Sequence, residues 1–319
     1  MREHPALLAW MRTSARSGVP TGVVDFSVRR GTARAHLLQG ALPDGRGVVA
    51  KHMSAAACAH ERRIYERVLP ALPVARVACY GAVRDEASAR SAQPRWWLFL
   101  EDAGGRPYHP PSDARLKVEW LAAVHRASAR LPAVAALPDR GIDFERRRLR
   151  VAIAILQAPL REGTLSARHA AVVRTTAADL ERLLGDWSDL AARAAGLPRV
   201  LVHGDLVAKN SRVRRDAFLV FDWETAGQGP PLLDLAELAD PARRDELLAY
   251  SHAVQEVHAG LGPEVVSACA RLGALLRYAA AIAWEALSLR SSDPSRCIEQ
   301  IAQYHESLRM WRAALRSRA

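Results

Sequence analysis

Short apolar runs separated by polar turns fill the first hundred residues of the chain. Residues 23–40 contain two such runs around a turn, and single runs cover 48–51, 74–83 and 96–100. Short runs that end at Gly, Pro or Asp are typical of β-strands. The pattern therefore predicts a small β-rich region. Apolar and basic positions alternating at helical spacing over 5–17 predict a short helix before it.

From about residue 106 the apolar positions recur at helical spacing instead. These longer patterns cover 116–129, 142–156, 167–184, 243–258, 264–289 and 296–316. The change of pattern predicts a second, mainly α-helical region. With 319 residues the chain is long for one compact core and suits two lobes, which we place at 1–105 and 106–319.

One polar stretch interrupts the helical region. The apolar pair Leu201-Val202 runs into His203-Gly204-Asp205, and Asn210 lies five residues after that aspartate. A second apolar run, 218–221, then leads to Asp222. Two strands on either side of a short loop would place the two aspartates and the asparagine in one small volume.

This set of side chains is what kinase-type phosphoryl transfer needs. One carboxylate orients the attacking hydroxyl and can take its proton, while an amide oxygen and a second carboxylate hold the magnesium that bridges the phosphates of ATP. Either aspartate alone would also suit a turn or a helix cap near a strand end. A turn or cap does not explain the ordered set of Asp205, Asn210 and Asp222.

Several parts of this stretch resemble the aminoglycoside phosphotransferase family and its choline kinase-like relatives: the HGDxxxxN pattern from His203 to Asn210, then Asp222-Trp223-Glu224, Gly229-Pro230 and Asp234-Leu235-Ala236. The resemblance implies an α+β, protein-kinase-like fold of two lobes, a small antiparallel sheet and a larger helical lobe, with a hinge at about 98–105. It also implies ATP and Mg²⁺ as cofactors. The expected acceptor is a hydroxyl group of a small molecule, such as an antibiotic or a natural-product-like metabolite.

The resemblance implies a role for each polar residue of the stretch. Asp205 would accept the proton of the acceptor hydroxyl or orient that group, and Asn210 and Asp222 would bind Mg²⁺, a hard cation that prefers oxygen ligands. His203 would brace the loop by hydrogen bonding. Asp234 would anchor the loop, although a helix cap is a simple alternative for an aspartate just ahead of a helix. Glu224, two residues after Asp222, is expected near the metal or the acceptor.

Lysine is rare, which makes each lysine informative. Only Lys51, Lys117 and Lys209 occur among 45 lysines and arginines, so a lysine here indicates a need for a compact ammonium group. The strand that ends at Lys51 resembles the V-A-I-K strand of kinases, where the lysine holds the nucleotide phosphates, and Glu61 is its expected partner. A solvent lysine on an edge strand is the alternative. Lys209 would bring charge to the γ-phosphate or to an acidic acceptor, or would face solvent.

Two further parts of a nucleotide site are indicated. The backbone N–H groups of Gly31 and Thr32 would meet a phosphate, although one glycine without a G-x-G-x-x-G pattern also suits a plain hairpin turn. Leu100 and Asp102 lie where the strand at 96–100 ends. The position resembles the hinge whose backbone groups meet adenine, and an ordinary strand and turn is the alternative.

The composition of the chain limits the binding partners and the cellular compartment that we expect. A net charge of +11 would favour polyanions, but the arginines are spread along the chain and no recognition module is readable, so nucleic-acid binding is not expected. The four cysteines lack metal-ligand spacing and indicate free thiols in a reducing cytoplasm. The N-terminus does not resemble a leader. Arg277 and Glu285 interrupt the longest apolar stretch, so no membrane helix is expected.

The acceptor is the open question. A cationic aminoglycoside would call for a cluster of acids, and the helices before the catalytic stretch offer scattered ones among many arginines: Asp143, Glu145, Glu162 and Asp186. Two alternatives therefore stay open. One is a kinase of Ser or Thr in a peptide, such as a biosynthetic precursor. The other is a nucleotide-binding pseudokinase that acts as a partner protein, which the poor glycine loop favours and the complete Asp-Asn-Asp set disfavours.

Overall fold

The computed structural model describes residues 4–13, 18–26, 34–89, 91–110, 112–291 and 293–316. The chain forms two compact units, the first comprising residues 1–120 and 207–225 and the second comprising 121–206 and 226–319. Besides the segment 1–105, the first unit thus contains both predicted metal ligands, Asn210 and Asp222.

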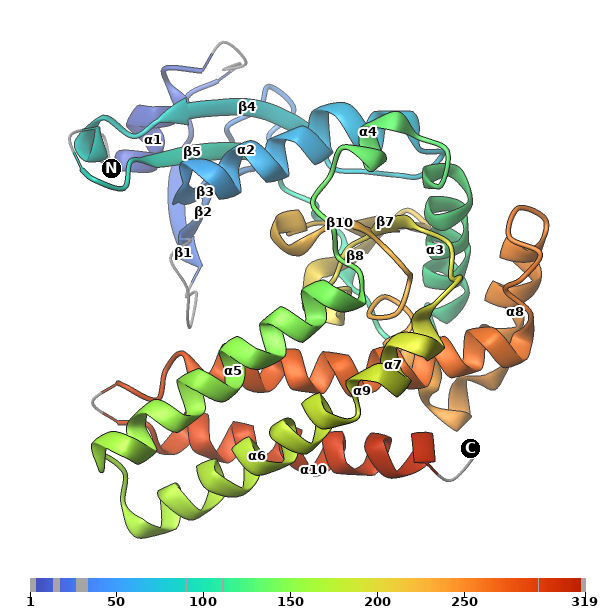
Figure 1. Ribbon diagram of the computed structural model, residues 1–319. Coiled ribbons are helices and arrows are strands. Elements are labelled where there is room, and N and C mark those ends of the chain that lie inside the picture. The colour runs from blue at the N-terminus through green and yellow to red at the C-terminus, as the bar shows by residue number, and fades with distance from the viewer. Residues whose placement is uncertain are drawn as a thin grey trace. The chain divides into compact units, whose positions relative to one another are not determined.

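A five-stranded antiparallel sheet is the framework of the first unit (Figure 1). Its strands follow the order β1-β2-β3-β5-β4 and are β1 (Gly22–Phe26), β2 (Arg34–Gln39), β3 (Val48–Ser54), β4 (Cys79–Arg84) and β5 (Arg95–Glu101). The predicted antiparallel sheet is confirmed. The strand predicted at 74–83 begins only at Cys79, and the N–H of the preceding Ala78 donates to the Glu101 side chain and not to a backbone carbonyl.

The two faces of this sheet carry different helices. On one face α1 (Pro5–Trp10) buries Trp10 against Phe99, with ring centroids 5.4 Å apart, and Ala50 belongs to the same core. Successive strand residues point to opposite faces, so Lys51 points to the other face, toward α2 (Ala55–Arg63). Helix α1 is shorter than the predicted helix at 5–17, of which 14–17 lie outside the described residues.

Helix α2 is positioned by its cap. The Ser54 side chain accepts a bond of 3.2 Å from the N–H of Ala57, as expected of a serine cap. The helix continues as a π-helical turn, Ile64–Val68, and a 3-10 turn, Leu69–Ala71. The buried face of this run includes Glu61, Ile64 and Val68, as its apolar spacing predicts.

A smaller sheet in the first unit carries the second half of the catalytic stretch. Its order is β6-β8-β9, with β6 (Arg106–Pro107), β8 (Ser211–Arg214) and β9 (Ala217–Val220). The prediction found β9 from its apolar run but missed β6 and β8, because these strands contain arginines and no apolar run. Phe218 packs edge-on against Tyr108 and Trp120, and the latter lies in α3 (Ala114–Ser128), so the hairpin is fixed to an aromatic cluster.

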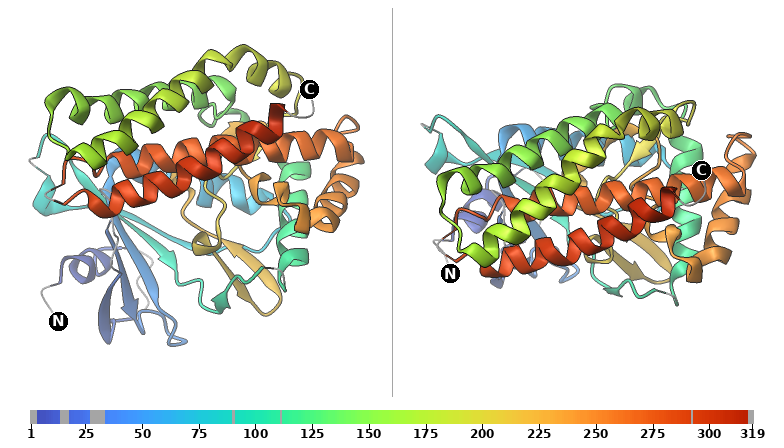
Figure 2. Two further views of the ribbon diagram at one scale, coloured as in Figure 1. Left: turned by 90° about the horizontal axis from the view of Figure 1, so that it is seen from below. Right: turned by 60° about the horizontal axis from the view of Figure 1, so that its bottom comes forward.

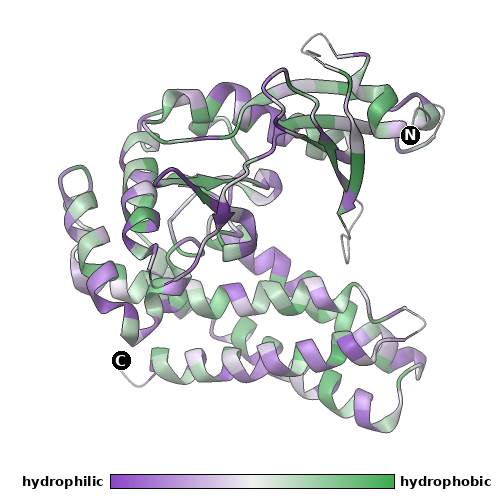
Figure 3. Ribbon diagram, turned by 180° about the vertical axis from the view of Figure 1, so that it is seen from behind, coloured by the Kyte–Doolittle hydropathy of each residue, from purple (hydrophilic) through white to green (hydrophobic). Residues whose placement is uncertain are grey.

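The second unit is mainly α-helical, as predicted. Its helices are α4 (Pro132–Ala135), α5 (Ile142–Glu162), α6 (Ala167–Gly185), α7 (Trp187–Ala194), α8 (Arg244–Gln255), α9 (Pro263–Ala286) and α10 (Ser295–Arg316). The four long helices α5, α6, α9 and α10 lie side by side (Figure 2). Hydrophobic and hydrophilic residues alternate along them (Figure 3), so each buries one stripe. Beside them β7 (Val200–Val202) pairs antiparallel with β10 (Gly227–Gly229).

Helix α9 corrects the expectation that no helix of the chain is apolar enough to span a membrane. Despite Arg277 and Glu285, it is long and apolar enough to cross a membrane by length and composition. Its most apolar window is 61% buried inside the protein, as in the core helix of a soluble protein, and it packs against α10 and α5. The helix is therefore weak evidence for a membrane span.

Gly273 in the middle of α9 allows a close backbone approach. A Cβ atom at this position would lie 1.7 Å from the carbonyl oxygen of Leu232, two residues before Asp234. We expect Gly273→Ala to lower the free energy of unfolding by about 3 kcal/mol, because backbone atoms must move to make room. Chemical denaturation would measure the change. Gly185→Ala is the matched control, since the helical Gly185 has no atom within 4 Å of the added methyl. Equal effects of the two substitutions would contradict the prediction.

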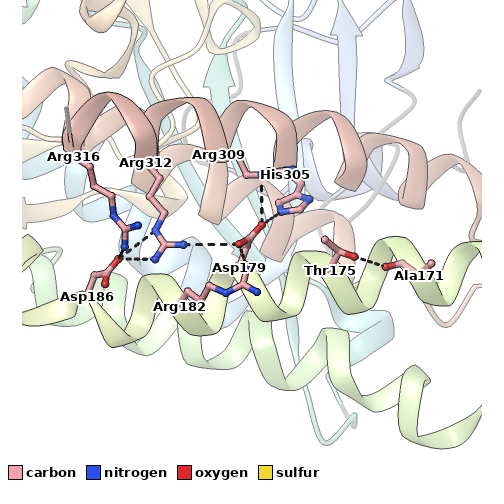
Figure 4. Close-up of polar contacts among 9 residues, drawn as sticks. All are labelled: Ala171, Thr175, Asp179, Arg182, Asp186, His305, Arg309, Arg312 and Arg316. Atoms are coloured by element: carbon pink, nitrogen blue, oxygen red, sulfur yellow. Dashed lines mark hydrogen bonds and ion pairs between the residues drawn. The ribbon is translucent and has the colours of Figure 1, made fainter.

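Asp179 of α6 and Asp186, the residue that follows α6, connect this helix to α10 (Figure 4). Asp179 is 2.7 Å from His305 Nε2 and 2.5 Å from an Arg182 nitrogen, and Asp186 accepts bonds from Arg312 and Arg316. Burial alone would raise the pKa of Asp179, but the hydrogen bonds from His305 and Arg182 outweigh it, so the pKa lies below its ordinary value. The folded state therefore favours the ionised carboxylate.

The network predicts an acid-sensitive contribution to stability. Because the folded-state pKa of Asp179 is lowered, its stabilisation is present above the unfolded pKa of about 3.9 and is lost as the pH falls through the folded pKa. We expect Asp179→Asn to lower the free energy of unfolding by about 1–3 kcal/mol at pH 7, with a smaller difference near pH 3. Denaturation curves between these pH values would test this. Glu299→Gln, on an exposed position of α10, should change little at either pH.

Candidate active site

The loop after β7 presents Asp205. His203 is 1% exposed, and its Nδ1 accepts a bond of 3.2 Å from the backbone N–H of Asp205. Gly204 has φ +78°, a left-handed conformation that a β-carbon disfavours. This conformation accounts for the glycine between the two residues. The loop leaves the Asp205 side chain partly exposed, with His203 beneath it.

Asp234 anchors this loop from within the second unit. Its carboxylate accepts bonds from the backbone N–H groups of His203 at 2.8 Å and Gly204 at 2.9 Å. His125 Nε2 lies 3.6 Å from the same carboxylate, and Tyr250 in turn fixes His125, with its hydroxyl 2.7 Å from Nδ1. The carboxylate thus bonds to the loop and not to the start of the following 3-10 turn. No local pattern indicates Tyr250, which lies 125 residues from His125.

Asp234 is buried, yet it stays ionised. Burial would raise its pKa, but His125 and the bonds from His203 outweigh burial and hold the pKa below the ordinary value. A carboxylate with two amide donors and an imidazole around it is well satisfied. His125 of α3 therefore contributes to the anchor.

Asp234→Asn should therefore weaken both stability and catalysis. An amide can accept at only one of its two polar atoms, so its NH₂ group would face a backbone N–H donor. We expect a loss of about 2–3 kcal/mol in the free energy of unfolding and a fall in turnover of about 100-fold, because the loop that carries Asp205 shifts. Denaturation and initial rates would measure the two effects. Asp240→Asn is the control, since Asp240 caps only an exposed 3-10 turn. Turnover equal to that of the control would contradict the anchoring role.

The first unit holds a buried cation between two carboxylates. Lys51 Nζ lies 2.5 Å from Glu61 Oε1 and 2.7 Å from Asp222 Oδ1. Lys51 is on β3, Glu61 is on α2, and Asp222 follows β9, so three separate elements meet here. Glu61 is fully buried. The structure thus brings together three of the predicted site residues, and the alternative of a solvent-facing Lys51 is wrong.

Burial and charge act against each other in this group. Burial disfavours the Lys51 ammonium, but Glu61 and Asp222 outweigh burial and raise its pKa. Burial raises the pKa of Glu61 to about 7, even with Lys51 beside it. Lys51 therefore remains a fixed positive charge at neutral pH.

Carboxylate oxygens also gather beside Lys51. One oxygen each of Glu61, Asp222 and Glu224 lie within 4.8 Å of one another. Asn210 is at the same end of the β8–β9 pair as Asp222, because its backbone oxygen accepts a bond of 3.1 Å from the N–H of Phe221. Hard oxygen donors of this kind suit Mg²⁺. Glu224 was expected near the metal or the acceptor, and it lies in this carboxylate group.

The predicted hinge contains an unpredicted clamp. Glu101, at the end of β5, accepts bonds from Arg46 and, at 2.7 Å, from Arg214, and its second oxygen accepts from the N–H of Ala78 at 3.0 Å. Leu100 is buried and pairs with β3 and β4, while the Asp102 side chain accepts from the N–H of Gly104. Arg46 and Arg214 are 55 and 113 residues from Glu101, so no local pattern could indicate them.

The remaining predicted residues are placed as follows. Lys209 lies in the 3-10 turn Ala208–Asn210 with an exposed side chain. Gly31 and Thr32 lie outside the described residues. Asp205 belongs to the second unit, whereas Asn210 and Asp222 belong to the first, and the meeting of the three in one small volume stays a prediction.

The scattered acids of the second unit form ion pairs. Glu145 is paired with Arg148 at 2.5 Å, and Glu162 with Arg290 at 2.6 Å. Asp186 is the carboxylate that holds Arg312 and Arg316. Three of the four candidate acceptor contacts are thus partly neutralised by neighbouring arginines.

Comparison with known proteins assigns the family and the fold. The family model described as the phosphotransferase enzyme family matches residues 43–266. Among solved structures, the choline kinase of Cryptosporidium parvum is 10% identical to this chain, with a TM-score of 0.63. The matched region covers 93% of this chain and 90% of the choline kinase. A microcompartment-associated aminopropanol kinase is 14% identical with a TM-score of 0.62 and covers 95% of both chains.

An ADP-bound aminoglycoside phosphotransferase is 15% identical, with a TM-score of 0.53, and covers 92% of this chain and 94% of its own. A search of the curated proteins found no match. At these identities the likenesses establish the fold, and the predicted protein-kinase-like architecture is confirmed.

Proposed function

The chain belongs to the phosphotransferase enzyme family, and we propose that it transfers the γ-phosphoryl group of ATP to a hydroxyl group of a small molecule, with Mg²⁺. The observation that carries this proposal is the buried Lys51 held between Glu61 and Asp222. A lysine fixed in this way is a point charge suited to nucleotide phosphates. The Asp234-anchored loop, with Asp205 at its end, supplies the second part.

Each residue has a defined part in the proposed reaction. Lys51 binds the phosphates, and Glu61 orients Lys51. Asn210 and Asp222 would hold Mg²⁺, with Glu224 close to Asp222. When bound, the metal neutralises charge on the transferring phosphoryl group. Asp205 orients the acceptor hydroxyl and takes its proton.

Asp205 needs no unusual acidity for this role. Positioning and electrostatics dominate a loose phosphoryl transition state, so a carboxylate that points at the hydroxyl suffices. The bonds from the loop to Asp234 and His203 limit the movement of Asp205. These contacts favour an active enzyme over the pseudokinase alternative.

A small hydroxylated molecule is the proposed acceptor. Proteins of similar fold act on choline, aminopropanol and aminoglycosides, according to their names. In this chain the candidate acids Glu145, Glu162 and Asp186 are already paired with arginines. We therefore expect an acceptor with fewer positive charges than an aminoglycoside. Free thiols at all four cysteines are consistent with a cytoplasmic enzyme.

Transfer of labelled γ-phosphate tests the proposal. The full chain would be incubated with labelled ATP or GTP, Mg²⁺ and one of two acceptor pools, hydroxylated metabolites with antibiotics or Ser/Thr peptides. Label in the first pool that is lost in Asp205→Ala supports the proposal. Label in the peptide pool would favour the peptide kinase. Binding of nucleotide without transfer or hydrolysis would favour the pseudokinase.

A further inference from the structure

Three side chains of the first unit lie close together at a place separate from Lys51, Glu61 and Asp222. His4 precedes α1, Asp25 is on β1 and His36 is on β2 (Figure 1). Asp25 Oδ1 lies 2.6 Å from His36 Nδ1 and 3.5 Å from His4 Nε2, and the three ligand atoms lie within 4.8 Å of one another. We propose that these residues form a binding site for a divalent transition-metal ion such as Zn²⁺.

The fold itself brings these side chains together. Asp25 and His36 are direct partners in the β1–β2 register, so their side chains leave the same face of the sheet. His36 also pairs with Ala50, which packs in the core beneath α1. Asp25 and His36 therefore lie on the face of the sheet that α1 covers, and His4 is the residue that precedes α1.

Among the residues that the structure describes, the side of the site at Asp25 is the more open one. The side chains of His36 and His4 are 12% and 27% exposed, while that of Asp25 is 71% exposed. The two imidazole rings meet edge to face with centroids 4.9 Å apart, and Trp97 contacts His36 from behind. Protein thus backs the imidazoles, and water can complete the coordination on the carboxylate side.

The distances suit a metal after small shifts. Zn–N and Zn–O bonds of about 2.0–2.2 Å separate neighbouring ligands of a tetrahedral ion by about 3.4 Å. The distances from Asp25 Oδ1 to the two imidazole nitrogens, 2.6 Å and 3.5 Å, lie on either side of this value. Two imidazoles and a carboxylate favour Zn²⁺, Co²⁺, Ni²⁺ or Cu²⁺, whereas Mg²⁺ prefers oxygen ligands alone.

One contact opposes metal binding and limits the affinity. His4 Nδ1 accepts a bond of 3.2 Å from the N–H of Ala6, so the proton of neutral His4 sits on Nε2. Ligation through Nε2 moves that proton to Nδ1 and breaks the cap. We expect this to lower the affinity about fivefold relative to a site without such a cap. Binding should also weaken at lower pH, because protons compete for both imidazoles.

The site is independent of the proposed phosphoryl transfer. Ala50 and Lys51 are consecutive on β3 and point to opposite faces, and His36 shares the face of Ala50. Lys51, Glu61 and Asp222 are therefore on the other face of the sheet. A bound ion would link α1 to the β1–β2 pair and raise the melting temperature, without entering the reaction.

Calorimetric titration of the full chain with ZnCl₂, in the presence of excess Mg²⁺, tests the site. We expect one Zn²⁺ ion to bind per chain with a dissociation constant in the micromolar range or below. Co²⁺ in its place should show visible d–d absorption bands that differ from those of free Co²⁺ in water. His36→Ala should weaken binding at least about tenfold. His252→Ala, which removes an exposed histidine of α8, should leave binding unchanged.

Asp25→Asn provides a second variant, because the exposed Asp25 contributes little to the core and its replacement should fold. It too should weaken Zn²⁺ binding about tenfold. Absence of Zn²⁺ binding to the unmodified chain would overturn the proposal. So would binding in both His36→Ala and Asp25→Asn that equals binding in His252→Ala.

Discussion

Replacement of Asp205 by Ala is expected to lower turnover about a thousandfold or more while the protein stays folded. The carboxylate would no longer orient the acceptor hydroxyl or take its proton, and positioned acid–base groups contribute about 10²–10⁴-fold. Asp205 is partly exposed, and its backbone N–H would keep its bond to His203 after the substitution. Phosphate transfer to the acceptor found in the pool experiment would measure turnover, and thermal unfolding would check the fold.

The prediction separates a catalytic role from a structural one. Asp189→Ala, on an exposed turn of α7, serves as the control and should keep normal turnover. Asp205→Asn preserves the volume of the side chain and should be nearly as slow as Asp205→Ala, because an amide cannot take the proton. Unchanged turnover in a folded Asp205→Ala protein would remove Asp205 from the mechanism.

Asp222→Asn is expected to produce the second large effect, a fall in turnover of at least about 100-fold. The substitution removes one of the two carboxylates that hold Lys51, at 2.7 Å, and one of the two residues expected to bind Mg²⁺. The concentration of Mg²⁺ needed for half-maximal rate should also rise, because a neutral ligand binds the cation less strongly. Rates measured over a series of Mg²⁺ concentrations would detect both changes.

Asp216 provides a closely matched control for Asp222. Asp216 lies in the turn between β8 and β9, and Asp222 follows β9. Both residues have a positive φ, 61° at Asp216 and 70° at Asp222. Asp216 is exposed in the turn and lies outside the carboxylate group. Asp216→Asn should therefore keep both normal turnover and the normal Mg²⁺ requirement. The same loss in both variants would indicate a backbone effect and contradict the metal role.

The sequence indicates a glutamate partner for Lys51, and the structure shows which glutamate it is. The V-V-A-K run indicated a functional lysine, but Glu61 and Glu66 both lie on the following helical segment. In the structure Glu61 is buried against Lys51, while Glu66 is exposed and paired with Arg62. The phase of the helix, set by the apolar positions Ile64 and Val68, decides which carboxylate faces the sheet.

The anchors of the site were less accessible to sequence reasoning. Asp234 was recognised from its position in a motif, but its companion Tyr250 carries no local signal. The clamp on Glu101 likewise unites Arg46 and Arg214 from distant parts of the chain. Long-range pairs depend on which strands become neighbours, and apolar periodicity does not encode that choice.

The local sequence patterns predicted a β-rich region followed by a mainly helical region, the order of the catalytic motif, and the family that this motif resembles. These properties are local, because periodicity and motif spacing are carried by residues close together in the chain. Packing of distant segments was needed to show that Lys51 also contacts Asp222, that His125 and Tyr250 support Asp234, and that His4, Asp25 and His36 converge. Burial and charge proximity arise only when distant segments pack together, and they set the ionisation of these groups.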